Sequence, residues 1–237
     1  MTNPYDELYQ HYNMALRPYG YSAGYVMWRN RQIKEPFVKY VASGAKVLDV
    51  GGGFGIFGSL LPKDRAEGYH NLDVSREMLE YSLFRNILGV GESLPFKDDA
   101  FDCVICSEVL EHVNDKEKTL SECHRVLKPY GLFCLSTPRT GWGKDFWANP
   151  VFKRIMQANA LLTKPKLQTP DPEGVKDEPS DEHWLKQAVE KVGFFVLSQY
   201  RADNHLPWGE SKFWMWFADR FVNPQTYGHC TVLICLK

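Results

Sequence analysis

The stretch VLDVGGGFG, residues 47–55, constrains the fold of this chain more than any other. Its uninterrupted apolar start is typical of a strand buried on both faces of a parallel sheet. The glycines that follow indicate a tight turn at the carboxyl end of that strand. Further strand-like runs come at GYHNLDVS, NILGV, FDCVICS, GLFCLSTP, FFVLSQYR and HCTVLICLK, with helical patterns between most of them. This alternation predicts a doubly wound, mostly parallel α/β sheet with a ligand at the carboxyl ends of its first strands.

The helical patterns have recognisable ends. FGIFGSLLP predicts a helix that stops at Pro62, and Ser75 is placed to cap the helix REMLEYSLF. DKEKTLSECHRVLKPYG predicts an amphipathic helix closed by its Lys-Pro-Tyr-Gly end, and DEHWLKQAVEKVGF predicts another helix. The expected layout is therefore strand, turn and helix repeated along the chain.

The charge beside the glycine turn decides which ligand is expected. Gly53, Gly55 and Gly58 match G-x-G-x-x-G, and Asp73 lies downstream where a dinucleotide site places its ribose-binding acid. That match, however, starts late relative to the end of the strand. Asp49 would also repel a pyrophosphate by Coulomb's law. The turn therefore either binds no anion or binds a ligand that carries positive charge.

The same turn fits D-x-G-x-G-x-G, from Asp49 to Gly55, and this resembles the class I S-adenosylmethionine-dependent methyltransferases, within them the methyltransferase-11-like group. The resemblance extends over residues 45–137 through HNLDVS, GVGESLPFKDDAFDCVICSEVLEHV and HRVLKPYGLFCLSTP, and YGHCTVLICLK resembles the last strand of these enzymes. It implies a Rossmann-like sheet of seven strands with an antiparallel last strand. S-adenosylmethionine has no phosphate and carries a sulfonium and an ammonium group, which suits an acidic turn.

The resemblance also implies a set of cofactor-binding residues. They are Asp49, Gly51, Gly53 and Gly55 in the turn, Asp73 and Val74 after the second strand, Gly91, Glu92 and Ser93 at the adenine, and Ser107 and Glu108 at the methionine part. Asp73 would accept hydrogen bonds from the ribose hydroxyls. Val90 stands where the family often has an aspartate that binds the adenine amino group. A backbone carbonyl or Glu92 is the expected substitute.

Methyl transfer needs a base only when the acceptor must lose a proton, as a hydroxyl does. His112, in LEHV just after the fourth strand, is the candidate base, since sugar O-methyltransferases of similar pattern use a histidine in this stretch. The alternative is a histidine that packs locally or shapes the cofactor pocket. The candidate acceptor-binding residues are Trp142, Trp147, His183 and His205.

The amino-acid composition bears on whether the chain binds nucleic acid or enters a membrane. Lys and Arg number 28 against 29 Asp and Glu, for a net charge of −1, so the chain lacks the basic excess of a nucleic-acid-binding protein. Neither a signal peptide nor an apolar run of the roughly 20 residues that span a bilayer is recognised, so we expect a cytoplasmic protein without membrane insertion. The segment 210–221 predicts a buried helix or a dimer face, or else a substrate lid or membrane-surface contact.

The six cysteines lack the spacing of a disulfide framework. Cys103 and Cys106 could suggest a metal or redox pair, but they fall in a predicted strand, where residues three apart point to opposite faces. We therefore expect free buried thiols and no metal.

These features together predict one methyltransferase domain over 1–237. It would consist of a helical cap (1–45), a cofactor-binding core (46–138), an insertion over the substrate (139–180) and a C-terminal helix, strands and aromatic segment (181–237). The expected reaction is in-line transfer of a methyl group, on oxygen, to a small molecule such as a natural product, quinone, sugar or lipid-linked glycan. The alternatives are a catalytically silent partner subunit that binds S-adenosylmethionine and an NAD-dependent oxidoreductase.

Overall fold

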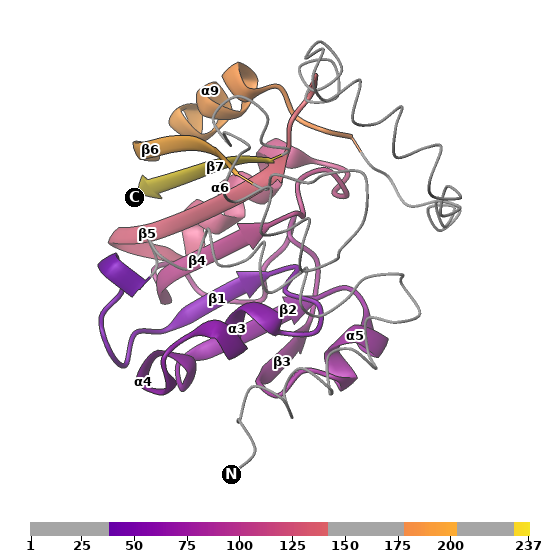
Figure 1. The fold of residues 1–237 in the computed structure, drawn as a ribbon, viewed down its shortest axis with the longest axis vertical. Coiled ribbons are helices and arrows are strands. Elements are labelled where there is room, and N and C mark those ends of the chain that lie inside the picture. Colours follow the sequence, from indigo (N-terminus) through magenta and orange to yellow (C-terminus); the bar gives the residue numbers. More distant parts are fainter. Residues whose placement is uncertain (1–37, 142–177, 203–229) are drawn as a thin grey trace, which may run out of the picture.

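The computed structural model describes residues 38–141, 178–202 and 230–237, and their core is a seven-stranded sheet. Figure 1 shows the sheet running through the middle of the molecule with helices on both sides. The elements, in chain order, are β1 (Val47–Val50), α3 (Ile56–Leu60), α4 (Lys63–Ala66), β2 (Tyr69–Asp73), α5 (Arg76–Glu80), β3 (Arg85–Leu88), β4 (Phe101–Ser107), α6 (Lys116–Val126), β5 (Leu127–Pro138), α9 (Glu182–Val192), β6 (Phe195–Ala202) and β7 (Cys230–Leu236).

The strand order is β3-β2-β1-β4-β5-β7-β6. Strands β1 to β5 pair in parallel, whereas β7 is antiparallel to both β5 and β6. The chain moves outward from β1 to β3 and then crosses back to β4 on the other side of β1. This reversal makes a topological switch point between β1 and β4, where doubly wound sheets bind ligands. The predicted fold class is confirmed, including the antiparallel last strand.

The core has one layer on each face of the sheet. On one face, Leu48 and Val104 pack with apolar residues of α6 and α9, including Leu120 and Leu185. On the other, Val47, Ile105 and neighbouring strand residues pack against Phe57 of α3. The four residues of β1 are all buried, as its apolar sequence predicts for a central parallel strand. Side chains on the two faces therefore reach the carboxyl edge of the sheet on opposite sides.

The helix ends follow the capping residues. Ser75 caps α5 as predicted, its hydroxyl accepting the N–H of Met78, and Asp115 caps α6 in the same way. The predicted end of α6 is wrong, because the helix stops at Val126 and LKPYG belongs to β5. Pro129 disfavours helical backbone at the residue before it. Leu127, fully buried, instead pairs with Phe101 of β4.

The two cysteines of CVIC point to opposite faces, as the strand pattern predicts. Cys103 lies with Cys134 on the α3 face, and Cys106 contacts Cys123 of α6 on the other face. Burial raises the pKa of the Cys103 thiol, and the contact with Cys123 together with burial raises that of Cys106. All six cysteines are free and buried, so the prediction of structural thiols is confirmed.

Three predicted features lie outside the described residues: the cap up to residue 37, most of the insertion, and the aromatic segment 210–221. The insertion leaves the sheet after β5 and the chain returns just before α9. Its two described ends are joined there, since Ser180 donates its N–H to Pro138 and accepts that of Thr140. No helix in the described ranges is long and apolar enough to cross a bilayer.

Candidate active site

The turn after β1 lies tightly against its neighbours, which explains its glycines. Gly51 has φ +69°, and a β-carbon there would lie 2.3 Å from Cγ2 of Val109, in the loop after β4. A β-carbon on Gly53, at φ +52°, would meet nothing closer than Sδ of Met78 at 3.5 Å. Gly51 is therefore required by a close approach, whereas Gly53 is favoured by its backbone conformation alone. The turn presents bare backbone at the switch point.

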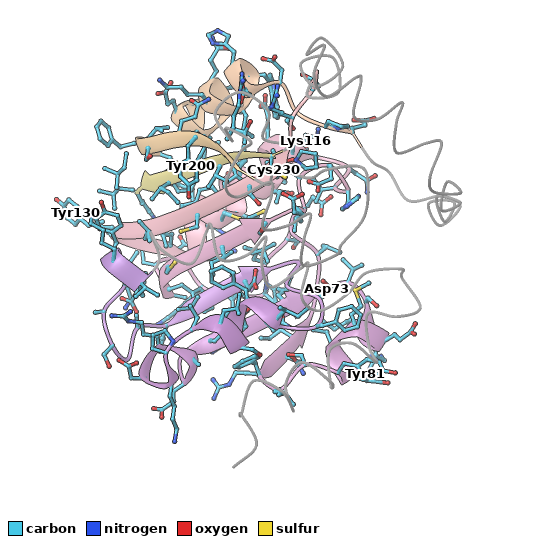
Figure 2. The ribbon with its side chains drawn as sticks, in the orientation of Figure 1. Asp73, Tyr81, Lys116, Tyr130, Tyr200 and Cys230 are labelled. Carbon is cyan, nitrogen blue, oxygen red and sulfur yellow. The ribbon has the colours of Figure 1, made fainter. Side chains whose placement is uncertain are left out.

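Asp73 ends β2 and connects the turn to that strand. One carboxylate oxygen accepts the N–H of Gly53 at 2.9 Å, and the other accepts the N–H of Ser75 at 2.8 Å. The side chain is half-buried at the carboxyl edge of the sheet, where Figure 2 labels it. Each carboxylate oxygen has two lone pairs, so Asp73 keeps acceptor capacity for a ligand while it fixes the turn. This geometry suits the predicted binding of ribose hydroxyls.

Asp49 lies beneath the turn rather than at its mouth. Its side chain is 3% exposed, and its carboxylate accepts the hydroxyl hydrogen of Tyr69 from β2. Burial raises the pKa of Asp49 to about 7, the bond from Tyr69 lowers it, and the charge of Asp73 raises it. Below that pH the group is neutral. The sequence predicts a charged Asp49 at the turn, but burial makes the charge of Asp49 depend on pH near neutrality.

A second polar group lies beside Asp49 under the turn. A β-carbon on Gly52 would lie 2.2 Å from Oδ1 of Asn71 and 2.8 Å from Oδ2 of Asp49. Within the described part of the chain, this Oδ1 is a buried oxygen without a hydrogen-bond partner, while the amide nitrogen donates to the carbonyl of Gly53. A buried acceptor of this kind favours a protonated neighbour. Tyr69 and Asn71 were not predicted as site residues; they lie in the polar strand YHNLD, which ends in the predicted Asp73.

The segment after β3 carries the predicted adenine contacts. Val90 is 44% exposed and Val74, after β2, is 68% exposed, so both offer apolar surface near Asp73. Gly91 is buried, and a β-carbon on it would lie 3.0 Å from Thr119 of α6. The carboxylate of Glu92 accepts the N–H of Asn114 at 2.9 Å and so joins this segment to the loop before α6. Ser93 is exposed and donates its N–H to the carbonyl of Val90.

The last residue of β4 and the residue after it form a polar network with β5 and β7. The hydroxyls of Ser107 and Ser136 lie 2.8 Å apart, and the hydroxyl of Ser136 donates to Oε1 of Glu108 at 2.9 Å. Oε2 of Glu108 accepts from the thiol of Cys230, at the start of β7, at 3.3 Å. Ser136 and Cys230 were not predicted as site residues. Only the tertiary structure brings them to Glu108, because Cys230 is more than 120 residues away in sequence.

His112 belongs to a separate cluster. Its Nε2 lies 3.8 Å from Oε1 of Glu111, and its side chain is 45% exposed. The other oxygen of the buried Glu111 accepts from the hydroxyl of Thr137 at 3.0 Å. Because neighbouring strand residues alternate, Thr137 points to the opposite face of β5 from Ser136. Glu111, which His112 contacts, and Glu108 thus come from one loop but bond to residues on different faces of β5.

Of the remaining predicted site residues, His183 is described and three lie outside the described residues. His183 lies on the exposed surface of α9, where its ring nitrogen contacts the side-chain amide of Gln187 at 3.0 Å. Trp142, Trp147 and His205 lie outside the described residues. Among the residues that the structure describes, no group of three or more His, Cys, Asp or Glu side chains is placed to hold a metal.

Comparison with known proteins finds similarity to methyltransferases. Residues 48–135 match the family model described as a methyltransferase domain. The chain is 33% identical over 153 residues to the ubiquinone/menaquinone biosynthesis C-methyltransferase UbiE of Rickettsia massiliae, which is 56% of this chain and 62% of that relative. It is 39% identical over 104 residues to the UbiE of Haemophilus ducreyi, covering 38% and 40% of the two chains. The chain therefore spans less than two thirds of the length of these relatives.

Solved structures share the fold at low identity. An S-adenosylmethionine-dependent methyltransferase from Thermotoga maritima, described as a possible histamine N-methyltransferase, matches with a TM-score of 0.61 and 16% identity over 97% of this chain and 99% of its own. A methyltransferase from Haloferax volcanii, in complex with its Trm112 activator, matches with a TM-score of 0.61 and 19% identity over 88% and 89%. These likenesses show that the seven-stranded sheet has the fold found in methyltransferases of known structure. Residues 48–135 thus match a methyltransferase-domain family model, and the surrounding fold is one that S-adenosylmethionine-dependent methyltransferases share.

Proposed function

We propose that this chain transfers a methyl group from S-adenosylmethionine to the oxygen of a small-molecule acceptor. The observation that carries the proposal is the carboxylate of Asp73, which holds the glycine turn by the N–H of Gly53 and still faces the carboxyl edge. A carboxylate in this place suits ribose hydroxyls. The carboxylate of Asp73 makes this edge acidic, which disfavours a pyrophosphate and suits a cationic ligand.

The residues of the site fit S-adenosylmethionine. The turn offers bare backbone at the switch point, and we assign the methionine side of the ligand to Gly51, Gly53 and Gly55. Ser107, the last residue of the neighbouring strand β4, is assigned to the same side. When bound, the cofactor supplies an activated methyl group on its sulfonium. A cation beside Asp49 would favour the ionised form of that acid and lower its pKa again. The carboxylate that is neutral in the free protein below about pH 7 would thus become charged on binding.

For the adenine we assign the surface formed by Val74, Val90 and the segment Gly91 to Ser93. Val74 and Val90 are both exposed apolar side chains, which can cover the two faces of a flat ring. Because one oxygen of Glu92 is used by the N–H of Asn114, its second oxygen or a backbone carbonyl is left to accept from the adenine amino group. An aspartate at position 90 is therefore not needed for adenine to bind.

Two observations support a small-molecule acceptor: the net charge of the chain and the described activity of its sequence relatives. A net charge of −1 does not favour nucleic acid. We assign acceptor contacts to Trp142, Trp147, His183 and His205, and a homodimer to the segment 210–221. We also propose a cytoplasmic location and a single domain over 1–237, with the boundaries given above.

A second candidate reaction is transfer to a ring carbon of a quinol, because the relatives at 33% and 39% identity are described as C-methyltransferases of quinone biosynthesis.

Calorimetry tests the cofactor and turnover tests the reaction. We expect S-adenosylhomocysteine, the product form of the cofactor, to bind and NAD not to bind; the reverse would refute the proposal in favour of an oxidoreductase. Release of S-adenosylhomocysteine is then followed with a panel of phenols, quinols, sugars and amines, and the product is analysed by mass spectrometry to locate the methyl group. Binding without turnover of any acceptor would favour a silent partner subunit.

His112→Ala tests the predicted base. Loss of turnover with unchanged affinity for S-adenosylhomocysteine is the result expected of a residue that acts on the acceptor. Parallel loss of both would place His112 in the cofactor pocket. Unchanged turnover would leave it as a residue that packs locally against Glu111.

A further inference from the structure

The network around Glu108 joins three neighbouring strands at the edge where the parallel strands end. Glu108 follows β4, its Oε1 accepts from Ser136 of β5, and its Oε2 accepts from Cys230 of β7. Its own N–H donates to the carbonyl of Ser136 at 2.9 Å. Both carboxylate oxygens are thus held by neutral donors, and backbone and side chain are fixed by the same residue of β5. A carboxylate held in this way has a defined orientation.

The backbone of Glu108 is in an unusual conformation for its position. It has φ +57°, and the other described non-glycine residues with positive φ are Asp99 and Tyr130. Those two are exposed residues outside the switch point, Tyr130 with 87% of its side chain accessible. Glu108, in contrast, is half-buried and directly follows the central strand β4. Strained backbone of this kind is found preferentially at functional sites, where the surrounding contacts maintain it.

The partners of Glu108 place it on the acceptor half of the site. The predicted ribose ligand, Asp73, follows β2, on one side of the β1–β4 switch point. Ser136 and Cys230 belong to β5 and β7, on the other side. Figure 2 shows Asp73 and Cys230 at the same edge of the sheet, on either side of β1 and β4. A ligand that extends from Asp73 toward the switch point therefore has the Glu108 network ahead of it, and we assign the methyl acceptor to that side.

We propose that Glu108 is a catalytic residue that takes the proton from a phenolic hydroxyl of the acceptor, an inference that rests on the function proposed above. The acceptor oxygen forms a bond to the methyl carbon while the carbon–sulfur bond breaks and its electron pair stays on sulfur. The hydroxyl proton passes to an oxygen of the Glu108 carboxylate. The charge balances, because the sulfonium becomes a neutral thioether and the carboxylate becomes a neutral acid.

The chemistry of a carboxylate selects the class of acceptor. A carboxylate is a weak base, so it is matched to a hydroxyl that is itself acidic, such as a phenol with a pKa of about 10, and not to an aliphatic alcohol. Ser136 and Cys230 orient the carboxylate without adding charge to it. The same proton transfer makes the ring carbons beside the hydroxyl nucleophilic. A phenol or hydroquinone therefore fits this site whether oxygen or carbon receives the methyl group.

Glu108 is better placed for this role than His112. The histidine contacts Glu111, whose other oxygen is held by Thr137 on the opposite face of β5 from Ser136. Glu108 bonds to Ser136 on the face that also carries Ser107 and Asp49 of β1, since Ser107 meets Ser136 and Asp49 pairs with Ile105 two residues before Ser107. The acid and the glycine turn thus belong to one side of the edge.

Glu108→Gln tests the proposal, because glutamine keeps the shape of the side chain and removes its basicity. The probes are catechol and 4-nitrocatechol, the second of which is largely ionised at pH 8 and needs no base. We expect turnover of catechol to fall by about 10²–10⁴-fold, turnover of 4-nitrocatechol to change little, and affinity for S-adenosylhomocysteine to stay within about twofold. Glu117→Gln, on the exposed surface of α6, is the matched control and should leave all three unchanged.

Each other outcome contradicts a defined part of the reasoning. An equal fall with both catechols would mean a structural role for Glu108. A large loss of affinity for S-adenosylhomocysteine would return Glu108 to the methionine part of the cofactor site. Wild-type turnover of amines or aliphatic alcohols but of neither catechol would refute the phenolic acceptor. Failure of the wild-type chain to bind S-adenosylhomocysteine would instead refute the proposed function itself.

Discussion

Replacement of Asp49 by asparagine should change how stability depends on pH. Burial holds the pKa of this acid near 7 in the folded chain, against 3.8 for the unperturbed group. Between these two values the folded state binds a proton that the unfolded state has released. The free energy of unfolding therefore falls as pH rises from about 4 to 7, and this contribution levels off above the folded pKa.

The magnitude follows from the size of the shift. A change of about three pKa units corresponds to roughly 4 kcal/mol, of which about 3 kcal/mol falls between pH 5 and pH 8. Asparagine does not titrate, so Asp49→Asn loses this slope while every other group is shared with the wild type. The difference in stability, variant minus wild type, should thus move in favour of the variant by about 3 kcal/mol over that range.

Urea unfolding of both proteins at pH 5, 6, 7 and 8, without cofactor, measures this difference. Tyr69→Phe is the companion variant: its lost hydroxyl no longer lowers the pKa of Asp49, so the fall in stability should continue to higher pH. Parallel profiles for wild type and Asp49→Asn would refute the reasoning, because they would mean that Asp49 has the same pKa in the folded and unfolded chains.

Two further predictions concern the turn. Asp73→Ala should weaken binding of S-adenosylhomocysteine by roughly 1–3 kcal/mol in calorimetry, since the ribose hydroxyls lose their charged acceptor; an unchanged affinity would remove Asp73 from the site. Gly51→Ala should lower the melting temperature more than Gly44→Ala, because both glycines have positive φ but a β-carbon on Gly51 would also meet Val109 at 2.3 Å, whereas one on Gly44 meets nothing within 4 Å. Equal melting temperatures would mean that Val109 moves aside freely.

The sequence predicted most of the described fold because its local patterns and its tertiary contacts agree. The apolar run at β1, the cap at Ser75 and the alternating elements all favour the structure that is found. The end of α6 is the exception. Residues 127–131 continue a helical stretch in sequence, but Leu127 is fully buried in the sheet beside Phe101. Pairing with a strand more than 20 residues away is invisible to a local pattern.

The sequence by itself determined the parallel sheet, the glycine turn and the acids that border it, since each is encoded by neighbouring residues. Tertiary structure decided what those acids do. Tyr69 and Asn71 enclose Asp49 beneath the turn, and this burial, not its place in the motif, raises its pKa. Glu108 meets a thiol from the last strand only because β7 inserts between β5 and β6. Residue identity is local, but desolvation and long-range contacts depend on what the fold brings alongside.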